Sequence, residues 1–115
     1  MAMDTATAQD IYRRLSRSRQ GALVEQLVRA AVRYARLRTD WQLAPVEERQ
    51  EMDAARTRAH DTFIDACNIL SRAMQEAGED NVWRAEIGAA GDPHDRKAIG
   101  DFACHLHCVL GLLAR

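Results

Sequence analysis

The side chains best suited to chemistry lie along one edge of a predicted helix over residues 45–77. Arg49, Arg56 and His60 follow at intervals of seven and four residues, which places them on one side of an α-helix. Arg56 points within about 40° of the apolar stripe, where a charge must be paired, hydrogen-bonded or bound to an anion. The sequence therefore leaves two interpretations open: an internal ion pair, for example with Asp101 or a loop carboxylate, or a site for an anionic group.

Further positive charge precedes the last predicted helix. Arg96 and Lys97 lie close to a helix start predicted at Asp92 and Pro93, where unpaired backbone N–H groups favour anions. Trp83 belongs to the connecting segment before it, where both core anchoring and ligand stacking remain open. The candidate ligand-binding residues are Arg49, Arg56, His60, Trp83, Arg96 and Lys97.

The segment Cys104 to Cys108, with the sequence CHLHC, has the residue types of a metal site. On a helix, however, His105 and His107 point about 160° apart and cannot share one ion. The sequence therefore favours a buried helix face of small residues over a metal site, and we predict neither a metal nor a cofactor.

Acidic residues near both ends of the helix over 45–77 are similar to the EExxE pattern of MazG-like nucleotide pyrophosphohydrolases. The matching residues are Glu47, Glu48 and Glu51 for the first half and Glu76 and Glu79 for the second. At 1.5 Å per residue the halves lie about 37 Å apart on one helix, so a single chain cannot bring them to one magnesium cluster. We predict no catalytic residues of this kind.

The pair His60-Asp61 resembles part of the HD phosphohydrolase pattern. That family also requires a histidine upstream of the pair, and this chain has no histidine before residue 60. The sequence therefore favours a protein that is not an enzyme.

Composition indicates one small domain in the cytoplasm. The chain has 115 residues, a formal net charge of −1 and three cysteines, and no apolar run approaches the roughly 20 residues that cross a bilayer. Charge is unevenly distributed, since residues 1–44 carry eight arginines against four acids and residues 45–91 carry five against ten. The basic residues that could contact nucleic acid are Arg13, Arg14, Arg17, Arg19, Arg29, Arg33 and Arg36.

Hydrophobic periodicity predicts an all-α fold: a three-helix bundle with a short extra N-terminal helix and a helical hairpin as its core. Residues 1–7 are predicted to be disordered, and residues 8–115 to form a single helical domain. The expected segments are a short helix over 9–19, a break over 16–21, helices over 22–41 and 45–77, a loop over 78–91, and a final helix from Asp92.

The last helix is nearly apolar on all sides from residue 102 onward. One narrow side carries small residues at intervals of four, three and four, which would let another helix approach closely. Because a small bundle can bury only one face internally, we predict a homo-oligomer. The predicted interface residues are Gly100, Cys104, His107, Cys108, Gly111 and Leu112.

Two resemblances bear on function. The segments RTRAHDTFIDACNILSR and DRKAIGDFACHLHCVLGLLAR are similar to small uncharacterised helical proteins of bacteria and mobile elements, which bring no established activity. The pattern of Arg56, Thr57, Phe63, Asn68, Leu70 and Arg72 resembles the helical hairpin of phage proteins that sequester cyclic nucleotides. That second resemblance implies an oligomer binding an anionic nucleotide between protomers, with Arg56 matching the hairpin's arginine, although residues 83–115 depart from it.

The leading hypothesis is a non-catalytic protein that captures an anionic small molecule such as a nucleotide signal, as a phage or mobile-element counter-defence protein would. One alternative is an interaction or inhibitor module that docks a host or phage protein, for example a defence-system component. A further alternative is nucleic-acid binding through the arginine-rich first third.

Overall fold

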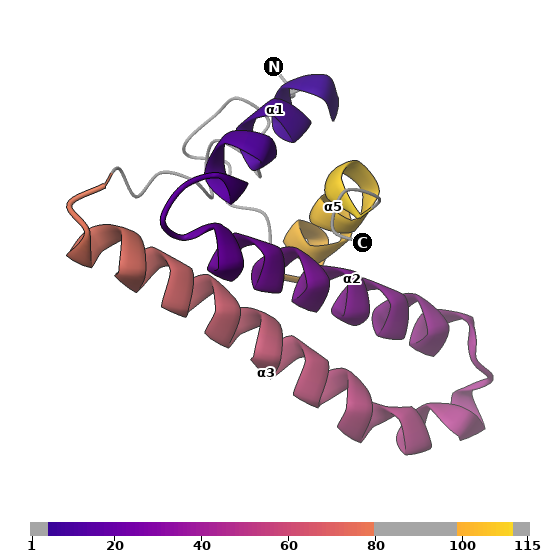
Figure 1. Cartoon of the computed structure of the whole chain (residues 1–115). Helices are drawn as coiled ribbons and strands as arrows, with labels where there is room; N and C mark the ends of the chain where they lie inside the picture. The colour runs from indigo at the N-terminus through magenta and orange to yellow at the C-terminus, as the bar shows by residue number, and fades with distance from the viewer. Residues whose placement is uncertain (1–4, 80–98, 112–115) are drawn as a thin grey trace.

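The computed structural model describes residues 5–79 and 99–111, and four helices contain most of them. They are α1 (Thr5–Ser16), α2 (Gly21–Leu43), α3 (Val46–Glu76) and α5 (Ile99–Leu110), and these residues contain no strand. Helices α2 and α3 form a long hairpin, and α2 contacts each of the other three helices (Figure 1). The predicted all-α bundle built on a helical hairpin is confirmed.

Local chemistry sets both ends of α3. Pro45, with φ of −56°, precedes its first residue and cannot continue a helix backward. At the other end, Gly78 has φ of +70°, and the N–H of Glu79 donates to the carbonyl of Met74 at 2.9 Å. This glycine-terminated arrangement satisfies carbonyl groups that the helix leaves unpaired. The helix predicted over residues 45–77 is therefore confirmed to within one residue at each end.

Helix α1 begins and ends earlier than the predicted segment over 9–19. It runs over Thr5–Ser16, so residues 5–7, expected to be disordered, are helical, and residues 1–4 lie outside the described part of the chain. The earlier end is explained by the turn that follows, in which the Ser18 hydroxyl donates to the carbonyl of Leu15 at 2.6 Å. The predicted break over 16–21 is confirmed.

Gly21 opens α2 where the chain passes very close to the end of α1. A Cβ atom at this position would collide with the backbone carbonyl oxygen of Ser16. Backbone cannot swing aside as a flexible side chain would, so we expect Gly21→Ala to lower the free energy of unfolding by about 1–2 kcal/mol. Urea denaturation would measure this. The control Ala22→Ser, at the next and exposed position, should change stability by less than about 0.5 kcal/mol, and equal effects at both sites would contradict the close approach.

The core lies where α2, α3 and α5 meet. Phe63 of α3 and Phe102 of α5 are both fully buried, with ring centroids 5.8 Å apart. On α5 the buried residues are Phe102, Ala103, Leu106 and Leu110. The start of that helix predicted at Asp92 and most of the loop predicted over 78–91 lie outside the described residues.

The buried side of α2 combines part of its predicted apolar stripe with the flank of that stripe. Helical spacing predicts a stripe of Leu23, Leu27, Ala30, Tyr34, Leu37 and Trp41, flanked by Val24, Val28, Ala31 and Ala35. Leu27 and Tyr34 of the stripe are buried. Val24, Val28 and Ala31 are buried, whereas Leu23 and Leu37 of the stripe are only half-buried. The reason is that α2 has neighbours on more than one side, and contact with α5 as well as α3 covers its flank.

The end of the hairpin extends past the other helices, as Figure 1 shows. Along α3, Ala59 and Phe63 are buried, but Met52 and Ala55 in the preceding turns are half-buried. Arg56 therefore lies where the apolar stripe is leaving the core. Among the described residues, no helix has the length and apolar character needed to cross a membrane.

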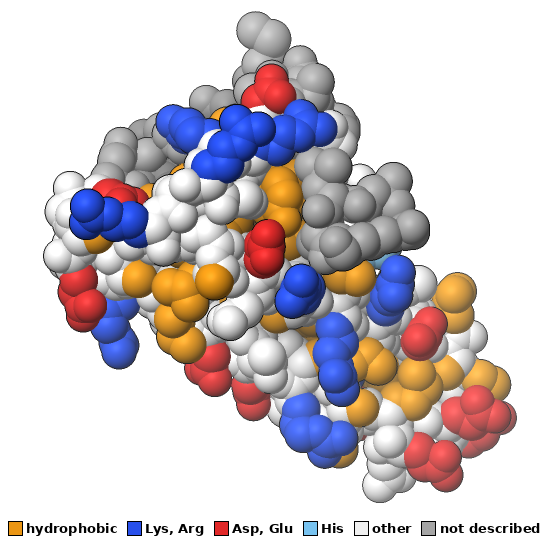
Figure 2. Space-filling model, viewed as in Figure 1, with side chains coloured by type: hydrophobic (Ala, Val, Ile, Leu, Met, Phe, Trp, Pro, Cys, Tyr) orange, Lys and Arg blue, Asp and Glu red, His pale blue; other side chains and the backbone are white. Residues whose placement is uncertain are grey.

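Charge is divided between the helices. Residues 9–43 carry eight arginines and three acidic residues, whereas residues 46–79 carry four arginines and eight acidic residues. On the face shown in Figure 2, Lys and Arg side chains lie over α1 and along α2, and acidic side chains gather at the far end of the hairpin. The net charge of −1 thus conceals a basic half and an acidic half.

Candidate anion-binding site

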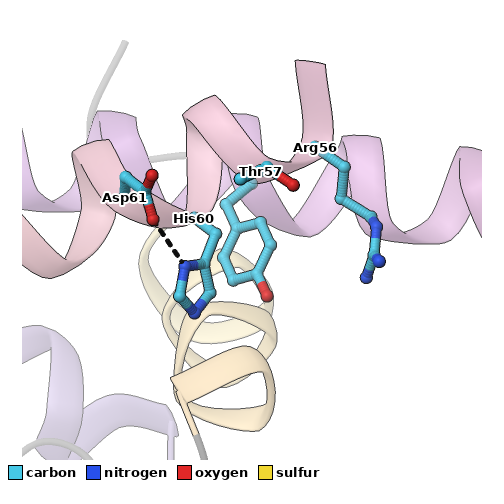
Figure 3. A pocket seen from close by; sticks show the side chains of 5 residues that line it. Arg56, Thr57, His60 and Asp61 are labelled. Atoms are coloured by element: carbon cyan, nitrogen blue, oxygen red, sulfur yellow. Dashed lines mark hydrogen bonds and ion pairs between the residues drawn. The ribbon is translucent and has the colours of Figure 1, made fainter. Parts of the chain in front are cut away.

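A pocket of about 430 Å³ opens between α3 and Tyr34 of α2. Its other lining residues are Arg56, Thr57, His60 and Asp61, which α3 presents together because they span little more than one helical turn. Arg56 and His60 leave the helix in the same direction (Figure 3). The structure thus brings together two of the six predicted ligand-binding residues.

Arg56 is held against an aromatic ring. Its guanidinium carbon lies 4.5 Å from the ring centroid of Trp41, a cation–π contact that ties α3 to the end of α2. The side chain is 33% exposed. Its Nε atom is buried, and no described residue accepts a hydrogen bond from it. The guanidinium is therefore positioned but retains an unused donor.

Among the described residues, the one carboxylate that pairs with Arg56 is a weak partner. Asp53 Oδ1 lies 4.0 Å from an Arg56 Nη atom, and the same oxygen accepts a hydrogen bond from Trp41 Nε1 at 2.8 Å. Asp101, the example given for an internal ion pair, does not pair with Arg56, because Asp101 pairs with Arg38 at 3.4 Å. The ion pair that Arg56 forms within the chain is the one with Asp53. An ion pair at the distance limit between half-exposed groups neutralises Arg56 only in part.

His60 is oriented from two sides. Its Nδ1 atom lies 3.1 Å from Asp61 Oδ1, and its ring meets that of Tyr34 edge-on at a centroid distance of 5.4 Å. If Nδ1 donates to Asp61, the other ring nitrogen is left for a ligand. Asp61 also contributes negative charge to this end of the pocket, so the Arg56 end is the one suited to an anion.

Arg49 lies outside the pocket, and its hydrogen bonds connect α3 to the end of α2. Its Nε donates to the carbonyl of Ala44 at 3.3 Å and its Nη2 to the carbonyl of Gln42 at 3.0 Å. These carbonyls lie at the C-terminal end of α2, where backbone acceptors are unpaired and the helix dipole favours a cation. The guanidinium also lies 4.5 Å from the Trp41 centroid. Two of its five N–H donors are therefore engaged at the end of α2, and Arg49 does not line the pocket. Its predicted role in ligand binding stays a prediction.

Trp83, Arg96 and Lys97, the other predicted ligand-binding residues, lie outside the described residues, as does Leu112 of the predicted interface. Trp41, in contrast, takes part in the site although periodicity placed it only at the end of an apolar stripe. Its position eight residues before Arg49, across a proline-containing turn, is the signal that could have paired them.

The small-residue side of α5 faces α2 of the same chain. Arg38 donates to Asp101 at 3.4 Å and to the Cys104 sulfur at 3.8 Å. A Cβ atom on Gly100 would collide with the Arg38 guanidinium, and one on Gly111 would lie 3.5 Å from a Val32 methyl carbon. Residues of α2 therefore cover Gly100, Cys104 and Gly111, which are part of the predicted interface. His107 is half-buried and Cys108 exposed, and the homo-oligomer stays a prediction.

Arg38 was not singled out by sequence reasoning. Burial works to lower its pKa, but the hydrogen bonds to Asp101 and Cys104 outweigh that effect, so the pKa of Arg38 is raised. A cation whose pKa is raised on folding contributes stability that is lost only as the pH rises through that raised value. Arg38 therefore retains this contribution across neutral and acidic pH.

Metal ligands do not converge in the described part of the chain: no group of three His, Cys, Asp or Glu side chains there could hold an ion. None of the three cysteines, Cys67, Cys104 and Cys108, forms a disulfide. Glu47 and Glu76, from the two halves of the acidic pattern, lie at opposite ends of α3, as expected from their spacing.

No protein-family model, curated protein or solved structure matches this chain. The two resemblances drawn from the sequence therefore stay predictions.

Proposed function

We propose that this is a non-catalytic binding protein that captures an anionic small molecule in the pocket between α3 and Tyr34. The observation that carries the proposal is the state of Arg56, whose side chain lines the pocket and whose ion-pair partner among the described residues, Asp53, lies as far as 4.0 Å away. Stacking on Trp41 fixes the guanidinium before a ligand arrives. Such preorganisation lowers the entropic cost of binding.

The lining indicates which ligands fit. A guanidinium forms paired hydrogen bonds with phosphate or carboxylate oxygens, while the Thr57 hydroxyl and the His60 ring add shorter-range polar contacts. Tyr34 supplies an aromatic wall. A volume of about 430 Å³ falls within the range of small-molecule sites. A phosphate-bearing metabolite with a planar group, such as a nucleotide signal, matches this combination, and sequestering such a signal would serve a phage or mobile-element counter-defence role.

The test is a thermal-shift panel with inorganic phosphate, mononucleotides and cyclic dinucleotides. A ligand at 100 times its Kd should add about 2.7 kcal/mol to the free energy of unfolding and raise the Tm. Arg56→Gln should weaken binding of the best ligand about tenfold or more, because it removes the charge and the paired donors. Arg56→Lys should recover only part of the loss, since an ammonium group lacks the planar fork.

Arg58→Gln is the matched control. Arg58 is an exposed arginine on the same helix, it does not line the pocket, and its loss changes the net charge equally. Binding that falls as much in this variant as in Arg56→Gln would show a general charge effect. A panel in which no ligand shifts the Tm, or an Arg56→Gln protein with wild-type affinity, would refute the proposal.

A further inference from the structure

A line of exposed arginines follows the outer side of α2. Arg29, Arg33 and Arg36 are spaced by four and three residues, which places them on one side of the helix over about 10 Å. All three are exposed. Figure 2 shows basic side chains along α2 and over α1 on the same face of the molecule. We call Arg29, Arg33 and Arg36 the basic face.

Most of the charge on this face is not neutralised within the chain. No ion pair to another described residue holds Arg29, Arg33 or Arg36. Like charges held in a row repel one another, and a bound polyanion would remove that repulsion.

The composition of the face distinguishes between possible polyanions. Insertion into a membrane surface would need apolar side chains beside the charges. Within residues 5–79 and 99–111, the large apolar side chains that are exposed are Leu43, Val46 and Ile69, and none of them lies between the arginines of the basic face. A single small anion would need convergent groups, whereas these arginines are spread along a line. A repeating anion with closely spaced charges fits that line, and arginine is suited to bind phosphate with paired hydrogen bonds.

We propose that the basic face binds the phosphate backbone of nucleic acid without reading its base sequence. Phosphate contacts position a protein on nucleic acid but carry no sequence information directly. The basic face shares no residue with the pocket that Arg56 lines. Binding of nucleic acid here is therefore independent of the proposed capture of a small anion, and an experiment can refute one proposal without refuting the other.

The experiment measures the affinity of the full chain for a fluorescently labelled duplex DNA of roughly 20 base pairs as salt rises from about 50 to 200 mM. Backbone binding predicts that log Kobs falls linearly with log salt concentration. In the double variant Arg29→Gln/Arg33→Gln the slope should become shallower by about 2, close to 1 for each phosphate that the protein no longer neutralises.

The matched control is Arg58→Gln/Arg72→Gln, which removes two exposed arginines from the acidic helix α3. Both double variants have the same net charge, so an unchanged slope in this control assigns binding to the basic face. A labelled single strand is tested in parallel. Binding of either form supports the proposal, with about 0.7 of slope per neutralised phosphate for the single strand.

Two results would overturn the proposal. One is no binding of duplex or single strand at the lowest salt concentration, and the other is an equal loss of affinity in both double variants. Circular dichroism checks that each variant keeps its helices. Should Arg29→Gln/Arg33→Gln fail to fold, Arg33→Gln/Arg36→Gln tests the same line with the same expected change in slope.

Discussion

Replacing Phe63 with alanine is expected to lower the free energy of unfolding by about 3–5 kcal/mol, the largest effect of any substitution considered for this protein. Phe63 is 0% exposed and its ring lies 5.8 Å from that of Phe102 and 6.3 Å from that of Tyr34, centroid to centroid. It therefore joins α3 to both α5 and α2. Truncation leaves a cavity where three helices meet, and the loss combines the transfer free energy of the ring with the cost of that cavity.

Urea denaturation followed by circular dichroism measures this change. Ile69→Ala on the same helix is the control, because Ile69 is 51% exposed and should lose about 1 kcal/mol or less. Equal losses at the two positions would contradict the packing of α3 on α2 and α5. A marginal domain of this size has a total stability of about 5–15 kcal/mol, so Phe63→Ala removes a large share of it.

Replacing Trp41 with alanine is expected to lower the free energy of unfolding by about 2–3 kcal/mol. The indole ring stacks with the guanidinium groups of Arg49 and Arg56, each worth about 0.5–1 kcal/mol at a partly exposed site. Its N–H also donates to Asp53 at 2.8 Å, and a hydrogen bond adds about 1 kcal/mol. These contacts hold the end of the hairpin where it extends beyond the core.

Trp41→Phe separates the two kinds of contact. A phenyl ring still stacks with both guanidinium groups but cannot donate to Asp53, so the variant should lose only about 1 kcal/mol. For the best anionic ligand of the panel, Trp41→Ala should weaken binding because Arg56 loses its support, whereas Trp41→Phe should bind nearly as tightly as the wild type. Equal affinities of Trp41→Ala and the wild-type protein would show that stacking does not position Arg56.

Sequence was sufficient for the bounds of α3 because they depend on nearby residues. Pro45 and Gly78 act on the backbone at their own positions, and the interval between them carries an apolar stripe with helical period. The buried side of α2 was not predictable in the same way. Which of two adjacent sides is buried depends on how many helices pack on it, and α5 returns to α2 only after a long stretch of chain.

The candidate site was likewise predictable only in part. The shared direction of Arg56 and His60 follows from their spacing of four residues, and the structure places both on one pocket. The partners of the arginines did not follow from spacing. The spacing of Arg49 is equally compatible with a side chain that faces a ligand. Only the structure shows that the carbonyls of Gln42 and Ala44 lie within hydrogen-bonding distance of it.

By itself, the sequence determined that the chain is helical, where α3 begins and ends, and that an arginine lies on its apolar stripe. Only the tertiary structure decided what that arginine meets. Helical periodicity fixes the direction of a side chain through local geometry. The partners of that side chain come from other segments of the chain. Here Trp41 of α2 packs against Arg56, and Asp101 of α5 pairs with Arg38. The unused donor on Arg56 is the product of that arrangement, because folding positioned the guanidinium without supplying a close carboxylate from the described residues.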